Sequence, residues 1–126
     1  MQKINLADKL SLFSAHWSPK IIAELNGQHV KLVKFRGEFV WHHHEHEDEL
    51  FLVVRGSFRM DLRDHAEGQA SRTVELREGE MFVVPRCVEH RPVADEEVSV
   101  LIFEPASTVN TGSAGGARTV PKPDWI

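Results

Sequence analysis

A dense cluster of side chains that can bind metal lies near the middle of the chain. Four of the eight histidines fall within five positions, His42–His44 and His46, and acidic residues continue as far as Glu49. Neutral imidazole nitrogens and carboxylate oxygens are donors that bind divalent transition metals. The cluster is internal and interrupted by acidic residues, which is not the pattern of an expression tag. We interpret it as a candidate metal site.

The spacing of the histidines limits which of them can share one ion. On a β-strand, residues i and i+2 point to the same face, so two pairs are compatible with a shared ion: His42 with His44, and His44 with His46. A straight strand would place Glu49 on the opposite face from His44, so the polar segment 45–48 must turn. After such a turn, Glu49 can face the histidines from the next strand. These residues alone leave the choice between the two pairs open.

A second segment carries another histidine. It runs from the turn residue Gly79 through a short apolar strand and a turn at Pro85 to His90. Considered by itself, His90 would more often be a histidine of the core than a metal ligand. The order of the two segments along the chain is a stronger indication that His90 is a metal ligand than His90 considered alone.

Both segments resemble the sequence motifs of the cupin family. Written out, the two motifs are His42-x-His44-x4-Glu49-x6-Gly56 and Gly79-x5-Pro85-x-Cys87-x2-His90. The resemblance covers roughly residues 24–105. It implies an all-β fold, a double-stranded β-helix or jelly-roll barrel, in which three histidines and one glutamate coordinate a divalent metal.

The family's spacing favours one of the two histidine pairs. Its pattern allows three or four residues between the second histidine and the glutamate. His42 with His44 leaves four residues before Glu49, whereas His44 with His46 leaves two, which is little length for the chain to reverse. The resemblance therefore assigns the first pair, Glu49 and His90 as ligands. It places His46 near the rim, as a hydrogen-bond partner of a ligand or a proton-transfer group.

Three imidazoles and one carboxylate suit Mn, Fe, Co, Ni or Zn in the divalent state. In a six-coordinate ion, four protein ligands leave two positions for water or substrate. The resemblance implies a metal-dependent enzyme acting on a small polar metabolite, either a carbohydrate or a keto or hydroxy acid. Cupins include oxygenases, isomerases, decarboxylases and lyases, so the fold and ligands do not select a reaction. The alternative is a non-catalytic module that holds a metal or small ligand for sensing or storage.

Residues beside the motifs are less informative. Cys87 stands where the family usually has glycine, and we expect it to be a small buried hydrophobic residue. Phe51, Val53, Phe82, Val84 and Phe103 are candidate walls of an apolar cup around the metal, but aromatic residues on strands more often belong to the core, which is the favoured interpretation. Four arginines near the motifs could bind an anionic substrate, although charged residues beside turns are usually solvated: Arg36, Arg55, Arg86 and Arg91.

The remaining pattern predicts a short helix followed by strands. Asn5 is a capping residue, and apolar residues at helical spacing continue to Phe13. Beyond Pro19, short runs rich in Val, Leu and Phe alternate with turn residues, which is typical of a sandwich or barrel. The expected strands are Ile21–Leu25, His29–Arg36, Glu38–His44, Glu49–Arg55, Phe58–Arg63, Arg72–Leu76, Met81–Val84 and Val98–Glu104. The polar segment 64–71 predicts a hairpin loop.

The 126 residues are enough for one domain. We divide the chain into an N-terminal segment 1–22 with the short helix, a barrel 23–105 and a C-terminal tail 106–126. The tail is rich in Ser, Thr, Gly and Ala, so we expect a mobile linker. Its apolar tip, Trp125 and Ile126, is expected to dock on the barrel or on a neighbouring subunit.

Composition excludes several classes of partner. The net charge is −4 and no cluster of Lys and Arg is present, which argues against nucleic acid. The apolar runs are far shorter than the ~20 residues of a membrane helix. A single cysteine and a start without the pattern of a signal peptide predict a cytoplasmic protein. We expect a small-molecule ligand, and we expect a homodimer because a small barrel exposes sheet edges.

Overall fold

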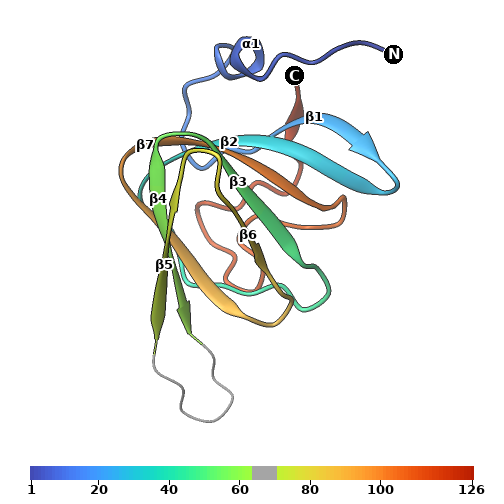
Figure 1. Cartoon of the computed structure of the whole chain (residues 1–126). Helices are drawn as coiled ribbons and strands as arrows, with labels where there is room; N and C mark the ends of the chain where they lie inside the picture. Colours follow the sequence, from blue (N-terminus) through green and yellow to red (C-terminus); the bar gives the residue numbers. More distant parts are fainter. Residues whose placement is uncertain (64–70) are drawn as a thin grey trace.

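The computed structural model of the chain describes residues 1–63 and 71–126, which form a short helix and a set of strands (Figure 1). The helix is α1 (Leu6–Leu10). The strands are β1 (Lys20–Leu25), β2 (Gln28–Glu38), β3 (Glu49–Arg55), β4 (Ser57–Arg63), β5 (Arg72–Arg77), β6 (Met81–Val84), β7 (Glu89–Pro105) and β8 (Asp124–Trp125). The protein is mostly β, as predicted. The predicted loop 64–71 falls outside the described residues, apart from Ser71.

Helix α1 is shorter than the predicted segment but begins where the capping residue indicates. The Asn5 side chain accepts a hydrogen bond of 3.0 Å from the backbone N–H of Asp8, which satisfies one free donor of the first turn. Leu10 is buried in a small apolar cluster with Ile22 and Leu32. The helix therefore packs its apolar side on β1 and β2. Within the described ranges, no helix is long and apolar enough to cross a membrane.

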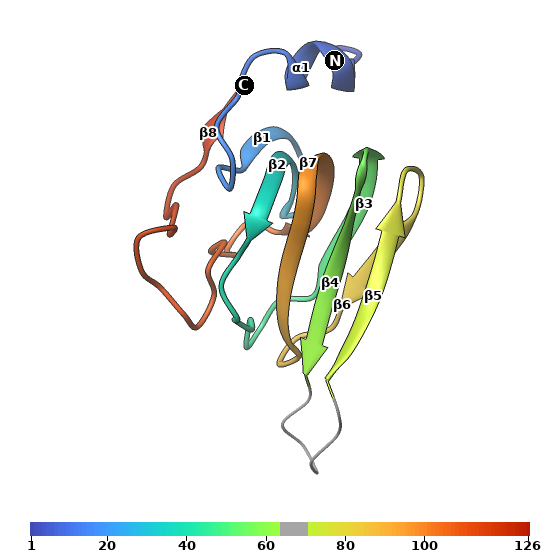
Figure 2. The same ribbon diagram turned by 90° about the vertical axis from the view of Figure 1, so that its left-hand side faces the viewer.

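Strand β7 is the centre of the sheet. It pairs antiparallel with β2, β3 and β4, and Figure 2 shows it lying between β2 and β4. Its first part pairs with β4 and its second part with β3, so β7 continues from one side of the molecule to the other. The strand order is β5-β4-β7-β2-β1-β8, with β3 joined to β7 and β6 joined to β3. Among the described strands the sheet is not closed, although the pairing is consistent with a jelly roll.

Alternate strand residues point into a shared interior. In β4 the residues Phe58, Met60 and Leu62 are buried, as their alternation with polar residues predicts. The main cluster of buried apolar residues is Val33, Phe35, Phe51, Val53, Phe58, Met60, Leu62, Leu76, Val84, Ala94, Val98, Val100 and Ile102. This cluster supports the elements that carry the candidate site.

One predicted strand is absent. The sequence predicts a strand over Glu38–His44, but β2 ends at Glu38 and the chain then follows an irregular path as far as β3. Within this path, His42 forms an isolated bridge with His90. The prediction is wrong because the histidine-rich run pairs with the start of β7 at one position and does not extend a ladder.

Strand β7 begins well before its predicted start at Val98. Pro92 and the acidic run Asp95–Glu97 have the pattern of a strand break. In the structure the Pro92 carbonyl accepts a hydrogen bond of 3.0 Å from the Phe39 N–H, so the proline still contributes an acceptor. The acidic side chains are exposed. The strand therefore tolerates both features.

The C-terminal tail is packed against the rest of the protein. Strand β8 pairs parallel with β1, and the Ile126 N–H donates to the Ile21 carbonyl at 3.0 Å. Earlier in the tail, Thr108 and Thr111 are buried, and the Ser113 N–H donates to the His43 carbonyl at 3.0 Å. The predicted mobile linker is therefore wrong, and the tip docks on the chain's own sheet. Figures 1 and 2 place the C-terminus and α1 at the same end of the molecule.

Candidate metal centre

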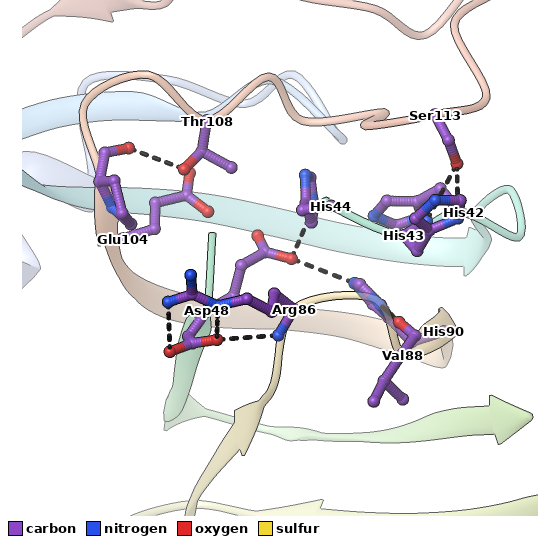
Figure 3. Close-up of polar contacts among 12 residues, drawn as sticks. His42, His43, His44, Asp48, Arg86, Val88, His90, Glu104, Thr108 and Ser113 are labelled. Atoms are coloured by element: carbon purple, nitrogen blue, oxygen red, sulfur yellow. Dashed lines mark hydrogen bonds and ion pairs between the residues drawn. The ribbon is translucent and has the colours of Figure 1, made fainter. Parts of the chain in front are cut away.

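The structure brings together the four residues that the resemblance assigns as ligands. His42 and His44 lie on the irregular segment between β2 and β3, Glu49 begins β3, and His90 lies near the start of β7. All four are buried, with at most 4% of each residue exposed. Each offers one ligand atom, and these atoms lie within 4.8 Å of one another. In Figure 3, dashed lines run from His44 and from His90 to one carboxylate, and the distances of 2.7 and 3.1 Å identify it as that of Glu49.

Backbone pairing joins the two motifs. The His42 N–H donates to the His90 carbonyl at 3.1 Å, and the His90 N–H donates to the His42 carbonyl at 2.8 Å. The two rings consequently lie 4.2 Å apart between centroids. The main chain thus holds together residues far apart in the sequence, in addition to the contact between the Glu49 and His90 side chains.

The same pattern of hydrogen bonding orients two of the imidazoles. Nδ1 of His42 lies 2.9 Å from the Val40 carbonyl, and Nδ1 of His90 lies 2.9 Å from the Val88 carbonyl. A carbonyl accepts and cannot donate, so each Nδ1 carries a hydrogen and each Nε2 faces the cluster. Burial, with a smaller contribution from the charge of His90, lowers the pKa of His42 to about 3. His42 is therefore neutral, with a lone pair on Nε2 available to a metal.

Glu49 supplies the negative charge of the cluster. Its Oε1 lies 2.7 Å from Nε2 of His44 and 3.1 Å from Nε2 of His90. Burial alone would raise the pKa of Glu49, but the hydrogen-bonding contacts of Glu104 and His90 and the close approach of His44 outweigh it and hold the pKa well below its usual range. Glu49 is therefore an ionised carboxylate in a buried site.

A second carboxyl group lies beside Glu49 and was not predicted. Burial and the negative charge of Glu49 raise the pKa of Glu104 well above its usual value, although Lys31 opposes the shift. Glu104 is thus the carboxyl of the pair that retains a proton. Lys31 and Glu104 face the interior from β2 and β7, and the sequence signal for them is a charged residue at an inward position of an otherwise apolar strand.

The donor atoms fit a divalent transition metal. Nε2 of His44 is buried and lacks a hydrogen-bond partner, although Glu49 Oε1 is only 2.7 Å away, so the contact has the distance but not the direction of a hydrogen bond. Buried polar atoms of native proteins rarely remain without a partner. A cation between the donors would satisfy this atom, and three nitrogens with one oxygen suit Mn, Fe, Co, Ni or Zn.

A narrow cavity leads to the cluster, and His42 and Glu49 line it. Its volume is about 30 Å³, which exceeds the need of a single water molecule by a small margin. One wall is an aromatic cluster in which Trp17 stacks on Phe35 and on Phe39, at centroid distances of 4.6 and 4.7 Å. A ligand that enters must therefore be compact and must pass aromatic faces.

The candidate wall residues mostly belong to the core, as favoured. Phe51 lines the cavity, but the other four predicted residues are not among its described lining residues. Val53 and Val84 belong to the main cluster of buried apolar residues. Trp17 was missed because it lies between α1 and β1, outside any strand pattern, with a positive φ of 58°. The full described lining is Trp17, Pro19, Val33, Phe35, Phe39, His42, Glu49, Phe51, Pro92, Ile102, Glu104 and Asn110.

The remaining histidines of the run lie outside the cluster. His43 turns toward the tail, where its Nδ1 lies 3.1 Å from Oγ of Ser113 (Figure 3). The His46 side chain is 85% exposed and lies 3.7 Å from Glu45. The structure therefore places His46 in solvent, away from the four clustered side chains.

Cys87 departs from its expected role. We expected a small buried residue, but Cys87 is exposed. Its φ of 68° lies in the left-handed region that favours glycine. Its N–H donates to the His44 carbonyl at 2.7 Å, so this turn helps to fix the segment that carries His44. The backbone explains why glycine is the usual residue at this position of the motif.

Comparison with known families agrees with this geometry. Residues 29–104 match the family described as the Cupin domain. This chain belongs to the cupin family. A cupin-2 domain protein from Shewanella frigidimarina is 48% identical, with a TM-score of 0.74 over 81% of this chain and 93% of that one.

Two further matches of this cupin cover less of the matched protein's length. The uncharacterized protein YdbB of Bacillus subtilis is 36% identical over 70 residues, which is 56% of this chain; the chain spans little more than half of that relative, 57%. A hydroquinone 1,2-dioxygenase in complex with Fe3+ is 17% identical, with a TM-score of 0.74 over 84% of this chain and 33% of that one. At that identity the likeness shows the cupin fold alone.

Proposed function

We propose that this cupin is a metal-dependent enzyme that acts on a small polar metabolite, a carbohydrate or a keto or hydroxy acid. His42, His44, Glu49 and His90 would hold the divalent metal. The observation that carries the proposal is the set of four buried donor atoms within 4.8 Å of one another. A buried group of this kind needs a cation to offset the carboxylate charge and to satisfy the imidazole lone pairs.

The surroundings support a site that a ligand can reach. A bound divalent metal would supply Lewis-acid or redox chemistry at the coordination positions that the protein leaves open. His42 and Glu49 line the cavity, so part of the cluster faces an entrance. Aromatic side chains form part of the cavity lining, and Glu104 holds a proton next to Glu49. The reaction belongs to one of the classes that cupins perform: oxygenase, isomerase, decarboxylase or lyase.

Metal analysis and ligand binding test this proposal. Protein purified without chelators should contain close to one transition metal per chain by mass spectrometry. In the Co(II) form, a chelating acid such as glycolate should change the visible spectrum, because it would enter open coordination positions. A protein that takes up no metal, or a Co(II) spectrum that no acid perturbs, would contradict the enzyme proposal.

A non-catalytic module is the second candidate, and the small cavity favours it. With a volume of about 30 Å³, the cavity is small compared with the pockets of about 300–1,000 Å³ that hold most small-molecule ligands. The two candidates differ in turnover. Metal-loaded protein that binds acids but converts no compound in a screen of keto acids, hydroxy acids and sugars would support a sensing or storage role.

We also propose that the protein is a homodimer. Within the described chain β6 pairs with β3 alone, which leaves one side of β6 as a sheet edge. Met81 and Val83 on this strand are 58% and 46% exposed. Exposed apolar edges are commonly covered by another chain. Light scattering at micromolar concentration should give the mass of two chains, and a monomer mass would contradict the proposal.

A further inference from the structure

Arg118 of the tail stands over the aromatic wall of the cavity. Its guanidinium carbon lies 5.3 Å from the centroid of the Trp17 ring and 5.8 Å from that of the Phe39 ring. Both rings line the cavity, and Phe39 also contacts the His42 ring edge-on at a centroid distance of 5.3 Å. One aromatic side chain therefore separates the cation from a residue of the candidate metal centre.

The tail holds Arg118 at this place through several hydrogen bonds. Asn110, which itself lines the cavity, donates from Nδ2 to the Arg118 carbonyl and accepts at Oδ1 from the Val120 N–H, both at 2.8 Å. The hydroxyls of Thr111 and Thr119 lie 2.6 Å apart, and Thr111 is buried. These contacts fix the backbone on both sides of Arg118. The hydrogen bonds of the tail therefore determine where Arg118 lies.

The charge of Arg118 is not neutralised by the described part of the protein. No carboxylate among residues 1–63 and 71–126 forms an ion pair with it. Two of the arginines near the motifs differ in this respect, since Arg86 pairs with Asp48 and Arg91 pairs with Asp61. A guanidinium that stacks on aromatic rings keeps its planar set of donors free for a carboxylate.

We propose that Arg118 recognises the carboxylate of a compact hydroxy or keto acid beside Trp17 and Phe39, two aromatic residues of the cavity wall. This inference deepens the proposed function and rests on it, because it selects the acid over the carbohydrate as the ligand class. The narrow cavity favours a ligand of few atoms. The aromatic rings offer a flat surface for the ligand to contact. Arg118 provides the positive charge that an acid requires and a sugar does not.

A matched pair of ligands tests the role of the charge. Glycolate and its uncharged amide, glycolamide, have the same number of non-hydrogen atoms. Their affinities for Co(II)-loaded wild type and Arg118→Ala are compared by visible spectroscopy. We expect Arg118→Ala to weaken glycolate binding about tenfold while glycolamide binding and Co(II) content stay unchanged. The glycolate affinity of Arg118→Lys should lie between those of the wild type and Arg118→Ala, because lysine keeps the charge but lacks the planar donors.

Arg55→Ala is the control for overall charge. Arg55 is exposed and lies at the opposite end of β3 from Glu49, so its loss should leave glycolate affinity unchanged. Equal glycolate affinities in wild type and Arg118→Ala, or no binding of glycolate by wild type, would overturn the inference.

A metal-free titration separates this inference from the proposed function. Glycolate is added to chelator-treated protein while the indole N–H of Trp17 is followed by NMR. If wild type takes up no Co(II), the metal proposal fails. A glycolate-dependent shift of the Trp17 signal that Arg118→Ala abolishes would still support the recognition of an acid, and its absence would overturn it.

Discussion

Nζ of Lys31 lies 2.7 Å from Oε1 of Glu104 in the interior, with side chains 2% and 3% exposed. Glu104 retains a proton beside the ionised Glu49, so the loss of Lys31 leaves the one negative charge of this carboxyl pair buried without compensation. In Lys31→Met, Glu49 and Glu104 would share a negative charge with no nearby lysine. We expect the metal-free variant to lose about 3 kcal/mol of unfolding free energy, measured by urea denaturation.

Two further variants identify the cause of that loss. Lys31→Met combined with Glu104→Gln should recover much of the stability, because the second carboxyl is then absent. Lys20→Met removes a lysine from a pair with Asp124, whose side chain is 78% exposed, and should cost less than about 1 kcal/mol. Equal losses in the single and double Lys31 variants would contradict this explanation.

The ligand register can be tested at two neighbouring histidines. His42 is buried in the cluster, whereas the His46 side chain is 85% exposed. We expect His42→Ala to lower metal affinity by more than about 100-fold, above the range for groups that only support a ligand. His46→Ala should retain the metal. Mass spectrometry of the purified variants measures the metal content, and an empty His46→Ala with a full His42→Ala would refute this register.

Acid should destabilise the metal-free protein through His42. The pKa of His42 is about 3 in the folded protein and about 6.5 when the chain is unfolded. Above pH 6.5 both states are neutral, and between pH 6.5 and 3 the unfolded state binds a proton that the folded state does not. Stability therefore falls as the pH falls, by about 3 kcal/mol at pH 4.5 from this group.

The His42→Gln variant isolates this contribution. Urea denaturation of chelator-treated wild type and variant is compared at pH 7.5 and pH 4.5. The wild type should lose more stability than the variant over this interval. A parallel decline in both proteins would show that other groups are responsible.

The tail has one position where a side chain cannot fit. A Cβ on Gly112 would lie 2.2 Å from the His43 carbonyl oxygen and 3.0 Å from Nδ1 of His44. Gly112→Ala should therefore displace the tail and lower stability by about 2–4 kcal/mol. Gly115 also has a positive φ, but a Cβ there meets nothing within 4 Å, so Gly115→Ala should cost only about 1 kcal/mol. Thermal denaturation compares the two, and equal losses would mean that the close approach is unimportant.

The sequence predicts most strands because each is a short apolar run between turn residues. The sequence correctly predicts that His42 and His44 lie close together. The reason it gives, a shared face of one strand, is wrong because the two do not lie on a continuous strand. Their rings lie 5.1 Å apart between centroids, and the bridge from His42 to His90 holds the segment in place. No local sequence pattern predicts a single long-range bridge. The spacing of the two motifs nevertheless predicts that His42 and His90 lie close together.

The parts that could not be predicted come from distant segments. Trp17 and Asn110 reach the cavity from the two ends of the chain. The composition of the tail, rich in small residues, indicates a linker, yet small residues also allow the close approach at Gly112. Composition does not distinguish a free segment from one that packs tightly, because both favour glycine and serine.

The long separation in sequence between the tail and its contacts sets an order of assembly. During synthesis the chain emerges from its N-terminus, so His42, His44, Glu49 and His90 are all available before Asn110 and Arg118. A chain released between these two groups would have every residue of the cluster. It would lack Arg118 and the tail contacts at His43 that hold the neighbouring segment.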